Sequence, residues 1–257
     1  MTADRPVQRP LPDSAGTPSG VDAPADWLQG RLGRELLAAE AQLLGGVLDD
    51  VFGLELLQLG GWGASRALLS ASRTRRQTIV SESGACETLD VQGRLAALPV
   101  QSGSVDAVLL PHTLEFEADP HAVVREADRV LTGEGQLIIL GFAPLSLWGL
   151  RAAASREGFP PGLRQLLSAH RLRDWLSLLG YEVVLTRPYL YSHPWERAKG
   201  HDPRRILRRG LFNPLPAGAY LIKARKHVYT LTPIRPRLRD RRRLLGGLVE
   251  PTTRNPS

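Results

Sequence analysis

Hydrophobic positions along the chain follow two spacings that alternate. Short apolar runs, which predict buried strands, lie at residues 54–59, 77–82, 104–111, 136–142, 181–191 and 218–226. Apolar residues at helical spacing lie at residues 26–52, 63–72, 119–135 and 168–180. An amphipathic helix is therefore expected before the first strand, and strands and helices are expected to alternate after it.

This alternation predicts an α/β fold. We expect a doubly wound, mostly parallel, seven-stranded Rossmann-like sheet with helices on both faces. A hairpin or an irregular strand is expected between residues 83 and 98, where the sequence has a Ser-Gly turn signal and no helical periodicity. The second crossover helix is therefore predicted to be missing. In such sheets ligands bind at the carboxyl ends of the strands, here residues 60–65, 82–83 and 111–116.

Composition divides the chain into three parts. Residues 1–24 are rich in Pro, Gly and Ser and have few large apolar groups, so we expect them to be disordered. Residues 25–230 carry the alternating pattern and form the predicted domain. Residues 231–257 are rich in Arg and Pro, and we expect a basic, disordered tail.

The net charge of +7 is unevenly distributed. Residues 196–257 contain 16 Lys and Arg against 4 Asp and Glu, whereas residues 1–195 contain 17 against 22. A basic C-terminal quarter is typical of proteins that bind nucleic acid or an anionic surface. A solvated basic face that keeps the protein soluble explains the same charge, and the sequence leaves both interpretations open.

Other features narrow the class of protein. A single cysteine excludes an internal disulfide framework and a cysteine-rich metal site, and no His, Asp and Glu spacing predicts another metal site. The first residues, MTADRPVQRP, lack the apolar core of a signal peptide, so we expect a cytoplasmic protein. The longest apolar run without charge, residues 136–150, is interrupted by Gly, Pro and Ser and is shorter than the ~18 residues of a membrane span.

One stretch carries a family likeness. Residues 95–142 contain a Leu-Pro motif, an acidic-apolar strand, an Asp-Pro helix with Glu and Arg, an Arg-Val-Leu turn with glycines, and a further strand. In this order they resemble the methyltransferase type 11 branch of the class I S-adenosylmethionine-dependent methyltransferases. The combination of PHTLEF, DPH and READRVL is similar to a poorly characterised proteobacterial subfamily with a degenerate glycine loop.

The resemblance implies S-adenosyl-L-methionine as cofactor and assigns residues to it. Glu82, at the end of the second strand, matches the acid that binds both ribose hydroxyls. The family's glycine loop, its adenine-side turn and the end of its fourth strand correspond to Gln58, Gly60, Gly61, Gly63, Arg94, Leu95 and Pro111.

Several of these positions depart from the family, and of the loop glycines only Gly60 falls at a family position. Gln58 and Arg94 stand where the family has carboxylates, and Trp62 brings a large ring into the glycine loop. The glycines also suit an ordinary tight turn between a strand and a helix. The loop is therefore either a cofactor loop or only a turn, and the retained Glu82 favours binding.

Methyl transfer depends mainly on placing the acceptor in line with the methyl group, so no dedicated catalytic motif is expected. If a general base is needed, His112 and Glu115 are best placed, just past the fourth strand. The alternatives are a hydrogen-bonded histidine that shapes the loop and a solvated loop acid. The amino-methylating Asn/Asp-Pro-Pro-aromatic tetrapeptide is replaced by residues 110–113, Leu-Pro-His-Thr, which disfavours exocyclic base amines as acceptors.

The acceptor itself is not specified by the sequence. An acceptor pocket is expected from loops after the fifth and sixth strands, with walls from Trp148, Trp195 and Phe212 and anion-binding groups from Arg204, Arg205, Arg208 and Arg209. The sequence thus predicts a methyltransferase with an unknown acceptor, and the four arginines suit an anionic one. The alternative is a non-catalytic binding or scaffold module, associated with nucleic acid through the basic C-terminus.

Overall fold

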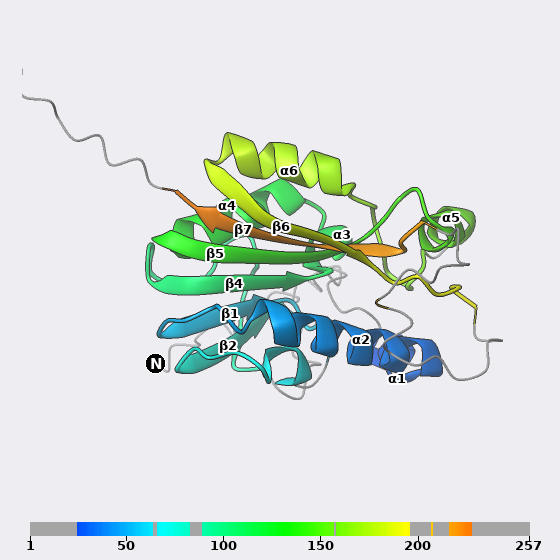
Figure 1. Ribbon diagram of the computed structural model, residues 1–257, viewed down its shortest axis with the longest axis horizontal. Coiled ribbons are helices and arrows are strands. Elements are labelled where there is room, and N and C mark those ends of the chain that lie inside the picture. Colours follow the sequence, from blue (N-terminus) through cyan, green and yellow to red (C-terminus); the bar gives the residue numbers. More distant parts are fainter. Residues whose placement is uncertain are drawn as a thin grey trace, which may run out of the picture.

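The computed structural model describes residues 25–63, 66–82, 89–156, 158–195, 207 and 216–227 (Figure 1). The predicted disordered segment 1–24 and the basic tail 231–257 lie outside these residues, as do Cys86, Phe212 and the four arginines of residues 204–209. The alternation of strands and helices predicted from the hydrophobic pattern is confirmed in the described part of the chain.

Seven strands form one sheet. They are β1 (Glu55–Leu59), β2 (Arg76–Ser81), β3 (Val91–Gln92), β4 (Val105–Pro111), β5 (Leu131–Phe142), β6 (Tyr181–Tyr189) and β7 (Ala219–Lys226). Their order across the sheet is β3-β2-β1-β4-β5-β7-β6. The pairs from β3 to β5 are parallel, and β7 runs antiparallel to β5 and β6. The predicted mostly parallel, seven-stranded sheet is therefore confirmed.

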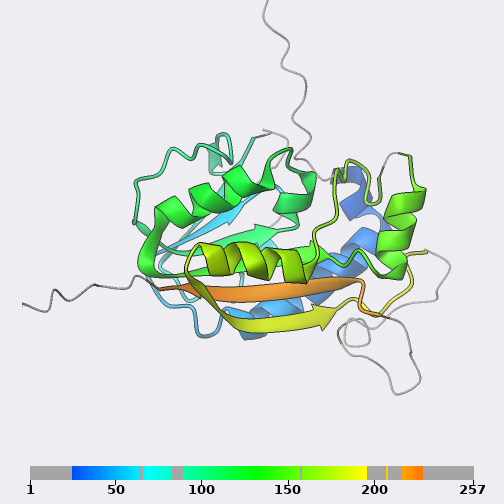
Figure 2. The ribbon, with the colours of Figure 1, turned by 90° about the horizontal axis from the view of Figure 1, so that it is seen from above.

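Helices cover both faces of the sheet. They are α1 (Ala25–Gln29), α2 (Arg31–Val47), the 3₁₀ turn η1 (Arg66–Leu69), α3 (Thr113–Phe116), α4 (Pro120–Val130), α5 (Leu147–Ala154) and α6 (Ala169–Leu178). Figure 2 shows α2 and α4 on opposite sides of the strands. One core cluster contains apolar residues of α2, η1 and α5, and the other contains those of α4 and α6. The sheet is thus buried on both faces, as parallel sheets usually are.

The long helix α2 shows how the hydrophobic pattern builds one layer. Its buried residues recur at helical spacing and include Leu32, Leu36, Leu43 and Leu44. The same buried face contains a charged residue, Glu40, whose side chain is fully buried. A carboxylate in an apolar stripe costs free energy unless donors surround it. This residue therefore marks a polar centre within the core.

Helix α4 begins where the sequence predicted it. The Asp119 side chain accepts a hydrogen bond from the Ala122 N–H at 3.0 Å, and Pro120 occupies the first turn. An acidic N-cap followed by proline is a strong local start signal, since the ring removes a donor that would lack a partner. The start of α4 directly fixes the length of the loop that follows β4.

The prediction of a helix over residues 63–72, after the glycine loop, is wrong in its length. In the described residues only the 3₁₀ turn η1 follows it, and the chain then returns toward β2. The Ser70 hydroxyl donates to the Ala67 carbonyl at 2.8 Å, and the hydroxyls of Ser72 and Thr74 bond each other at 2.8 Å. Such local hydrogen bonds of Ser and Thr compete with the helical ladder, which explains the early end.

Most of the connection from β2 to β3, residues 83–88, lies outside the described residues, so the missing crossover helix stays a prediction. Asp90 joins the sheet before β3 begins, because its carboxylate accepts the Ile79 N–H at 2.8 Å and its own N–H donates to the Ile79 carbonyl. No helix in the described ranges is long and apolar enough to cross a bilayer.

Candidate cofactor site and an adjoining buried network

The carboxyl ends of β1, β2 and β4 lie side by side, and the loop after β1 needs a glycine at its first position. Gly60 has φ +94°, and a Cβ atom there would lie 2.9 Å from the Thr113 hydroxyl oxygen. The Gly60 N–H donates to the Val80 carbonyl at 2.8 Å, which ties the loop to β2. The backbone at Gly60 is therefore held close to both neighbouring strands, in a conformation that favours glycine.

Gln58, the second-last residue of β1, holds this loop through side-chain hydrogen bonds to its backbone. Its Nε2 atom donates to the carbonyls of Gly60 and Trp62, each at 3.2 Å. Its Oε1 atom is buried and has no partner among the described residues. The neutral amide thus organises the loop backbone and adds no charge to it. Gly61 continues the loop, and Gly63 has φ +72° with a would-be Cβ 3.1 Å from Leu37 Cδ2.

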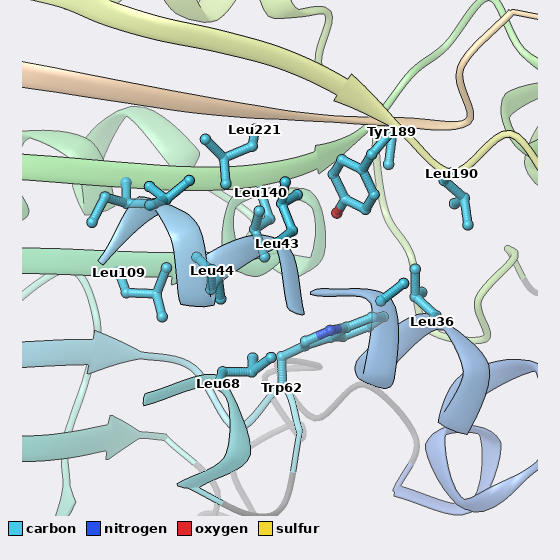
Figure 3. Packing of buried hydrophobic residues seen from close by; sticks show 14 of the residues in the cluster. Leu36, Leu43, Leu44, Trp62, Leu68, Leu109, Leu140, Tyr189, Leu190 and Leu221 are labelled. Atoms are coloured by element: carbon cyan, nitrogen blue, oxygen red, sulfur yellow. The ribbon is translucent and has the colours of Figure 1, made fainter. Parts of the chain in front are cut away.

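Trp62 lies in the loop after β1, and its ring is buried. The side chain is buried in the core beneath α2, close to Leu36 and Leu68 (Figure 3). Its Nε1–H donates to Glu40 Oε2 at 2.8 Å. The ring also lies 4.5 Å from the His112 ring and 5.8 Å from the Phe116 ring, measured between centroids, so it packs against α2 and against residues that follow β4. That the ring stands where the backbone has to approach a ligand stays a prediction.

Glu82 directly follows β2 at the same edge of the sheet. The side chain is half-buried, and its Oε1 atom accepts the Leu95 N–H at 3.2 Å. This contact joins the end of β2 to the turn that contains Arg94, which is exposed, and Leu95, which is buried in the core. A carboxylate has about four acceptor positions, so Glu82 retains capacity for hydroxyl donors of a ligand.

His112, directly after Pro111 at the end of β4, lies in a fully buried polar network. Its Nε2 atom lies 2.8 Å from Glu40 Oε1 and its Nδ1 atom 3.0 Å from Glu115 Oε2. The Tyr189 hydroxyl, from the end of β6, donates to the same Glu40 oxygen at 3.0 Å. Glu115 also accepts the Phe142 N–H at the end of β5. The network therefore links α2 to the ends of three strands.

The backbone and the rings around His112 fix its position. His112 has φ 55°, an uncommon left-handed conformation for a residue with a side chain. Its ring lies 4.0 Å from the Phe142 ring and 4.5 Å from the Trp62 ring, measured between centroids. Residues held in strained conformations persist only when their surroundings determine them strongly, and the two carboxylates supply that constraint here.

The electrostatics of this network keep the imidazole charged. Burial lowers the pKa of His112, but the carboxylates of Glu40 and Glu115 raise it more, to about 9. Burial raises the pKa of Glu115 above its usual value, and the hydrogen bond from His112 offsets part of this rise. Burial and the charge of Glu40 also raise the pKa of Tyr189 well above its usual value. At neutral pH His112 is therefore an imidazolium between two acids.

A set of buried oxygens near the ends of β1, β2 and β4 tests whether this edge fits a polar cofactor. Gln58 Oε1, Ser81 Oγ and Glu117 Oε1 each lack a hydrogen-bond partner among the described residues. Buried polar atoms are normally paired, and exceptions in a native fold require an explanation. Together with the tight Gly60 loop and the acceptor capacity of Glu82, they fit a ligand that presents several donors, as a nucleoside does.

Several predicted site residues meet at one edge of the sheet, and a buried network beside them was not predicted. The structure brings together Gln58, Gly60, Glu82, Leu95 and Pro111 near one edge, and it places His112 and Glu115 in the core beside it. Glu40, Tyr189 and Glu117 were not predicted. The signal for Glu40 was available, since it is a charged residue within the apolar stripe of α2. Tyr189 gave no such signal because it lies far from Glu40 in sequence, and Glu117 gave none because it lies in an irregular loop.

Of the three aromatic residues expected to line an acceptor pocket, Trp148 and Trp195 are among the described residues and Phe212 is not. Trp148 is buried and its Nε1–H donates to the Ser192 carbonyl at 2.9 Å, whereas Trp195 is half exposed. Trp148 also stacks on Phe142 at 5.8 Å between ring centroids, and is therefore part of the core beside the network. In the described ranges no cluster of His, Cys, Asp and Glu has the geometry of a metal site.

The strand order β3-β2-β1-β4-β5-β7-β6 with an antiparallel β7, and the glycine loop and acid at the ends of β1 and β2, define a class I methyltransferase fold. A family model described as a methyltransferase domain matches residues 63–139. The uncharacterised protein YafS of Escherichia coli K12 is 34% identical over 220 residues, which cover 85% of this chain and 87% of YafS.

Further comparisons agree with this assignment. The uncharacterised protein Rv2003c of Mycobacterium tuberculosis is 29% identical over 201 residues, 70% of this chain and 65% of that protein. Among solved structures, a methyltransferase from Thermotoga maritima shares the fold with a TM-score of 0.61 at 20% identity, covering 78% of this chain and 93% of its own. One from Archaeoglobus fulgidus has a TM-score of 0.57 at 16% identity, covering 78% and 97%.

The chain therefore belongs to the S-adenosylmethionine-dependent methyltransferase family, in the branch that contains YafS. The cofactor of this family is S-adenosyl-L-methionine. The resemblance inferred from residues 95–142 is confirmed, and so is its placement in a poorly characterised subfamily.

Proposed function

We propose that the protein transfers a methyl group from S-adenosyl-L-methionine to an acceptor, with the cofactor seated at the carboxyl ends of β1, β2 and β4. The observation that carries this proposal is the Glu82 carboxylate at the end of β2, which is tied to the Leu95 N–H and retains acceptor capacity. When bound, the cofactor supplies a methyl group on a sulfonium. The chain then has to hold the cofactor, place the acceptor and exclude water.

Each residue of the edge has a role in this proposal. Glu82 accepts hydrogen bonds from the two ribose hydroxyls, and Gly60 lets the backbone approach the ligand closely. Gln58 shapes the loop through its bonds to the Gly60 and Trp62 carbonyls and does not supply charge. Arg94 and Leu95 border the adenine side, next to Glu82.

The geometry favours a positioning role for His112 and Glu115, one of the two alternatives that the sequence leaves open. Both ring nitrogens of His112 face carboxylates, and its pKa of about 9 makes the imidazolium a poor proton acceptor at neutral pH. The pair instead holds the loop after β4 in its strained conformation. The acceptor therefore has to react in a form that needs little help from a base, or lose its proton to another group.

The acceptor is proposed to be a small anionic molecule, on the basis of the basic segment 196–209 alone. Nucleic acid bound through the C-terminal basic residues is the competing proposal. Binding to nucleic acid would fall steeply with salt, because each phosphate contact releases counterions.

A second candidate function is a non-catalytic module. The observation in its favour is that the Gln58 amide is engaged with carbonyls of its own loop, where the family has a charged group. Such a module would retain the fold of the sheet and would not bind S-adenosyl-L-methionine.

Calorimetric titration of S-adenosylmethionine and S-adenosylhomocysteine into the full chain separates the two candidates. We expect the wild type to bind with a Kd of the order of 1 μM, about −8 kcal/mol. Glu82→Ala should weaken binding by about 10- to 100-fold, since a charged acceptor is removed. Glu134→Ala is the matched control, because Glu134 is exposed near the opposite end of the sheet, where it pairs with Arg225. No heat and no thermal shift at ~1 mM cofactor, where about 4 kcal/mol of stabilisation is expected, would refute the enzyme and support the module.

A further inference from the structure

Glu117 is a buried acid that the proposed roles do not use. It follows α3 in the loop between β4 and α4, and only 8% of its surface is exposed. Its Oε1 atom is buried and has no hydrogen-bond partner among the described residues. A carboxylate oxygen in this state loses its water without gaining a donor, so the fold carries a cost that packing alone does not explain.

The loop that contains Glu117 is held firmly in place. The N–H groups of Arg164 and Gln165 both donate to the Glu115 carbonyl, at 3.0 and 3.2 Å, and Gln165 Nε2 donates to the Glu117 carbonyl at 3.0 Å. A second segment of chain, residues 164–165, therefore holds the backbone that carries the Glu117 side chain.

The charges that act on Glu117 place it beside the cofactor edge. They come from Glu82 after β2, from Arg94 in the adenine-side turn and from Arg164. Burial raises the pKa of Glu117 and the negative charge of Glu82 raises it further, whereas Arg164, a hydrogen bond from the Ala118 N–H and Arg94 offset part of this rise, so that the pKa is about 7. Glu117 follows α3, just past the carboxyl end of β4, and thus lies at the same edge of the sheet as Glu82.

We propose that Glu117 is a further cofactor-binding acid, whose free carboxylate oxygen accepts a hydrogen bond from the adenosine half of the cofactor. This assignment rests on the proposed function, because it needs a nucleoside seated on Glu82. It provides an acceptor on the side where Arg94 has replaced the family's carboxylate. It also gives a reason for the unpaired oxygen: the missing donor belongs to the ligand.

The experiment compares binding of S-adenosylhomocysteine with that of 5′-methylthioadenosine, which lacks the amino acid half. Glu117→Leu keeps the volume and removes the acceptor, and Glu117→Gln keeps an acceptor oxygen and removes the charge. Glu134→Gln serves as the control, as an exposed acid near the other end of the sheet. We expect Glu117→Leu to weaken both ligands by about 10-fold or more, Glu117→Gln to weaken them less, and the control to leave them unchanged.

Two further readouts separate binding from a structural role. A donor on the ligand favours the charged carboxylate, so wild-type binding near pH 7 should release protons, measured by calorimetry in buffers of different ionisation enthalpy. Glu117→Leu should abolish this release, and the ligand-free variant should melt no lower than the wild type at pH 8, because it no longer buries a charge.

The outcomes are distinct. Equal binding of both ligands by wild type and Glu117→Leu would overturn this inference and leave the proposed function intact. A loss confined to S-adenosylhomocysteine would overturn the adenosine assignment, since the contact would then lie in the amino acid half. A wild type that binds neither ligand would overturn the proposed function and the inference with it.

Discussion

The buried network around Glu40 predicts a dependence of stability on pH. Glu40 is fully buried and accepts hydrogen bonds from Trp62 Nε1, from the Tyr189 hydroxyl and from His112 Nε2, at 2.8 to 3.0 Å. The perturbation that tests it is Glu40→Gln. The amide keeps a similar shape and one acceptor oxygen, but it removes the charge that faces the imidazolium.

The magnitude follows from the pKa of His112. It is raised from 6.5 to about 9 in the folded protein. A group whose pKa is raised by folding stabilises the fold fully below its unfolded pKa, and this contribution is lost as pH rises through its folded pKa. At 1.36 kcal/mol per unit, the shift corresponds to about 3 kcal/mol, lost between pH 6.5 and about pH 10. Without the charge of Glu40, burial lowers the pKa of His112, so most of this dependence should disappear.

Urea unfolding at pH 6.5, 8 and 10 is the assay. We expect the wild-type free energy of unfolding to fall by about 3 kcal/mol over this range, and that of Glu40→Gln to be about 3–5 kcal/mol lower at pH 6.5 and nearly flat. The control is Glu35→Gln, on the same helix, where the carboxylate pairs with Arg31 at 3.1 Å on a partly exposed face. It should follow the wild-type slope. If Glu40→Gln and wild type lose stability in parallel from pH 6.5 to 10, the charged network does not exist as described.

Two further substitutions test the loop after β1. Gly60→Ala should lower the free energy of unfolding by about 1–3 kcal/mol, because it places a Cβ atom at φ +94° and 2.9 Å from the Thr113 hydroxyl oxygen. Its control is Gly46→Ala in α2, where the space is open, and this change should raise the free energy of unfolding by about 0.5–1 kcal/mol. Equal shifts in melting temperature for the two variants would contradict this contrast. Trp62→Phe should cost about 1–3 kcal/mol, because the buried Glu40 Oε2 loses its donor, and an unchanged urea midpoint would show that this hydrogen bond contributes nothing.

Local chemistry explains why some elements could be predicted from sequence. The strand positions follow from short apolar runs, and the start of α4 follows from Asp119 and Pro120, whose contacts lie within one turn. The start of α6 is similar, with the Ser168 hydroxyl accepting the Arg171 N–H at 3.2 Å. The glycine at position 60 and the acid at position 82 also fall on predicted strand ends. Each of these features depends on residues close to one another in the chain.

The length of the helix after the glycine loop could not be predicted in this way. Its apolar spacing is helical, but hydroxyl hydrogen bonds from Ser70 and Ser72 end it after the 3₁₀ turn η1. The direction of the Trp62 ring was equally undetermined. A tryptophan in a glycine loop can point toward a ligand or into the core, and only the acceptor on Glu40, 22 residues earlier, decides between them.

The sequence by itself determined the alternation of strands and helices and the family, and it predicted the edge of the sheet where a ligand is proposed to bind, because periodicity, caps and motifs are local. Tertiary structure alone decided that Glu40, His112, Glu115 and Tyr189 form one buried network, and that Glu117 is buried where the charge of Glu82 acts on it. These groups come from separate elements, and burial changes the pKa values of His112, Glu115, Glu117 and Tyr189 only after the sheet has closed around them. The physical reason is that charge interactions depend on distance and burial in the folded molecule, which residue spacing does not encode.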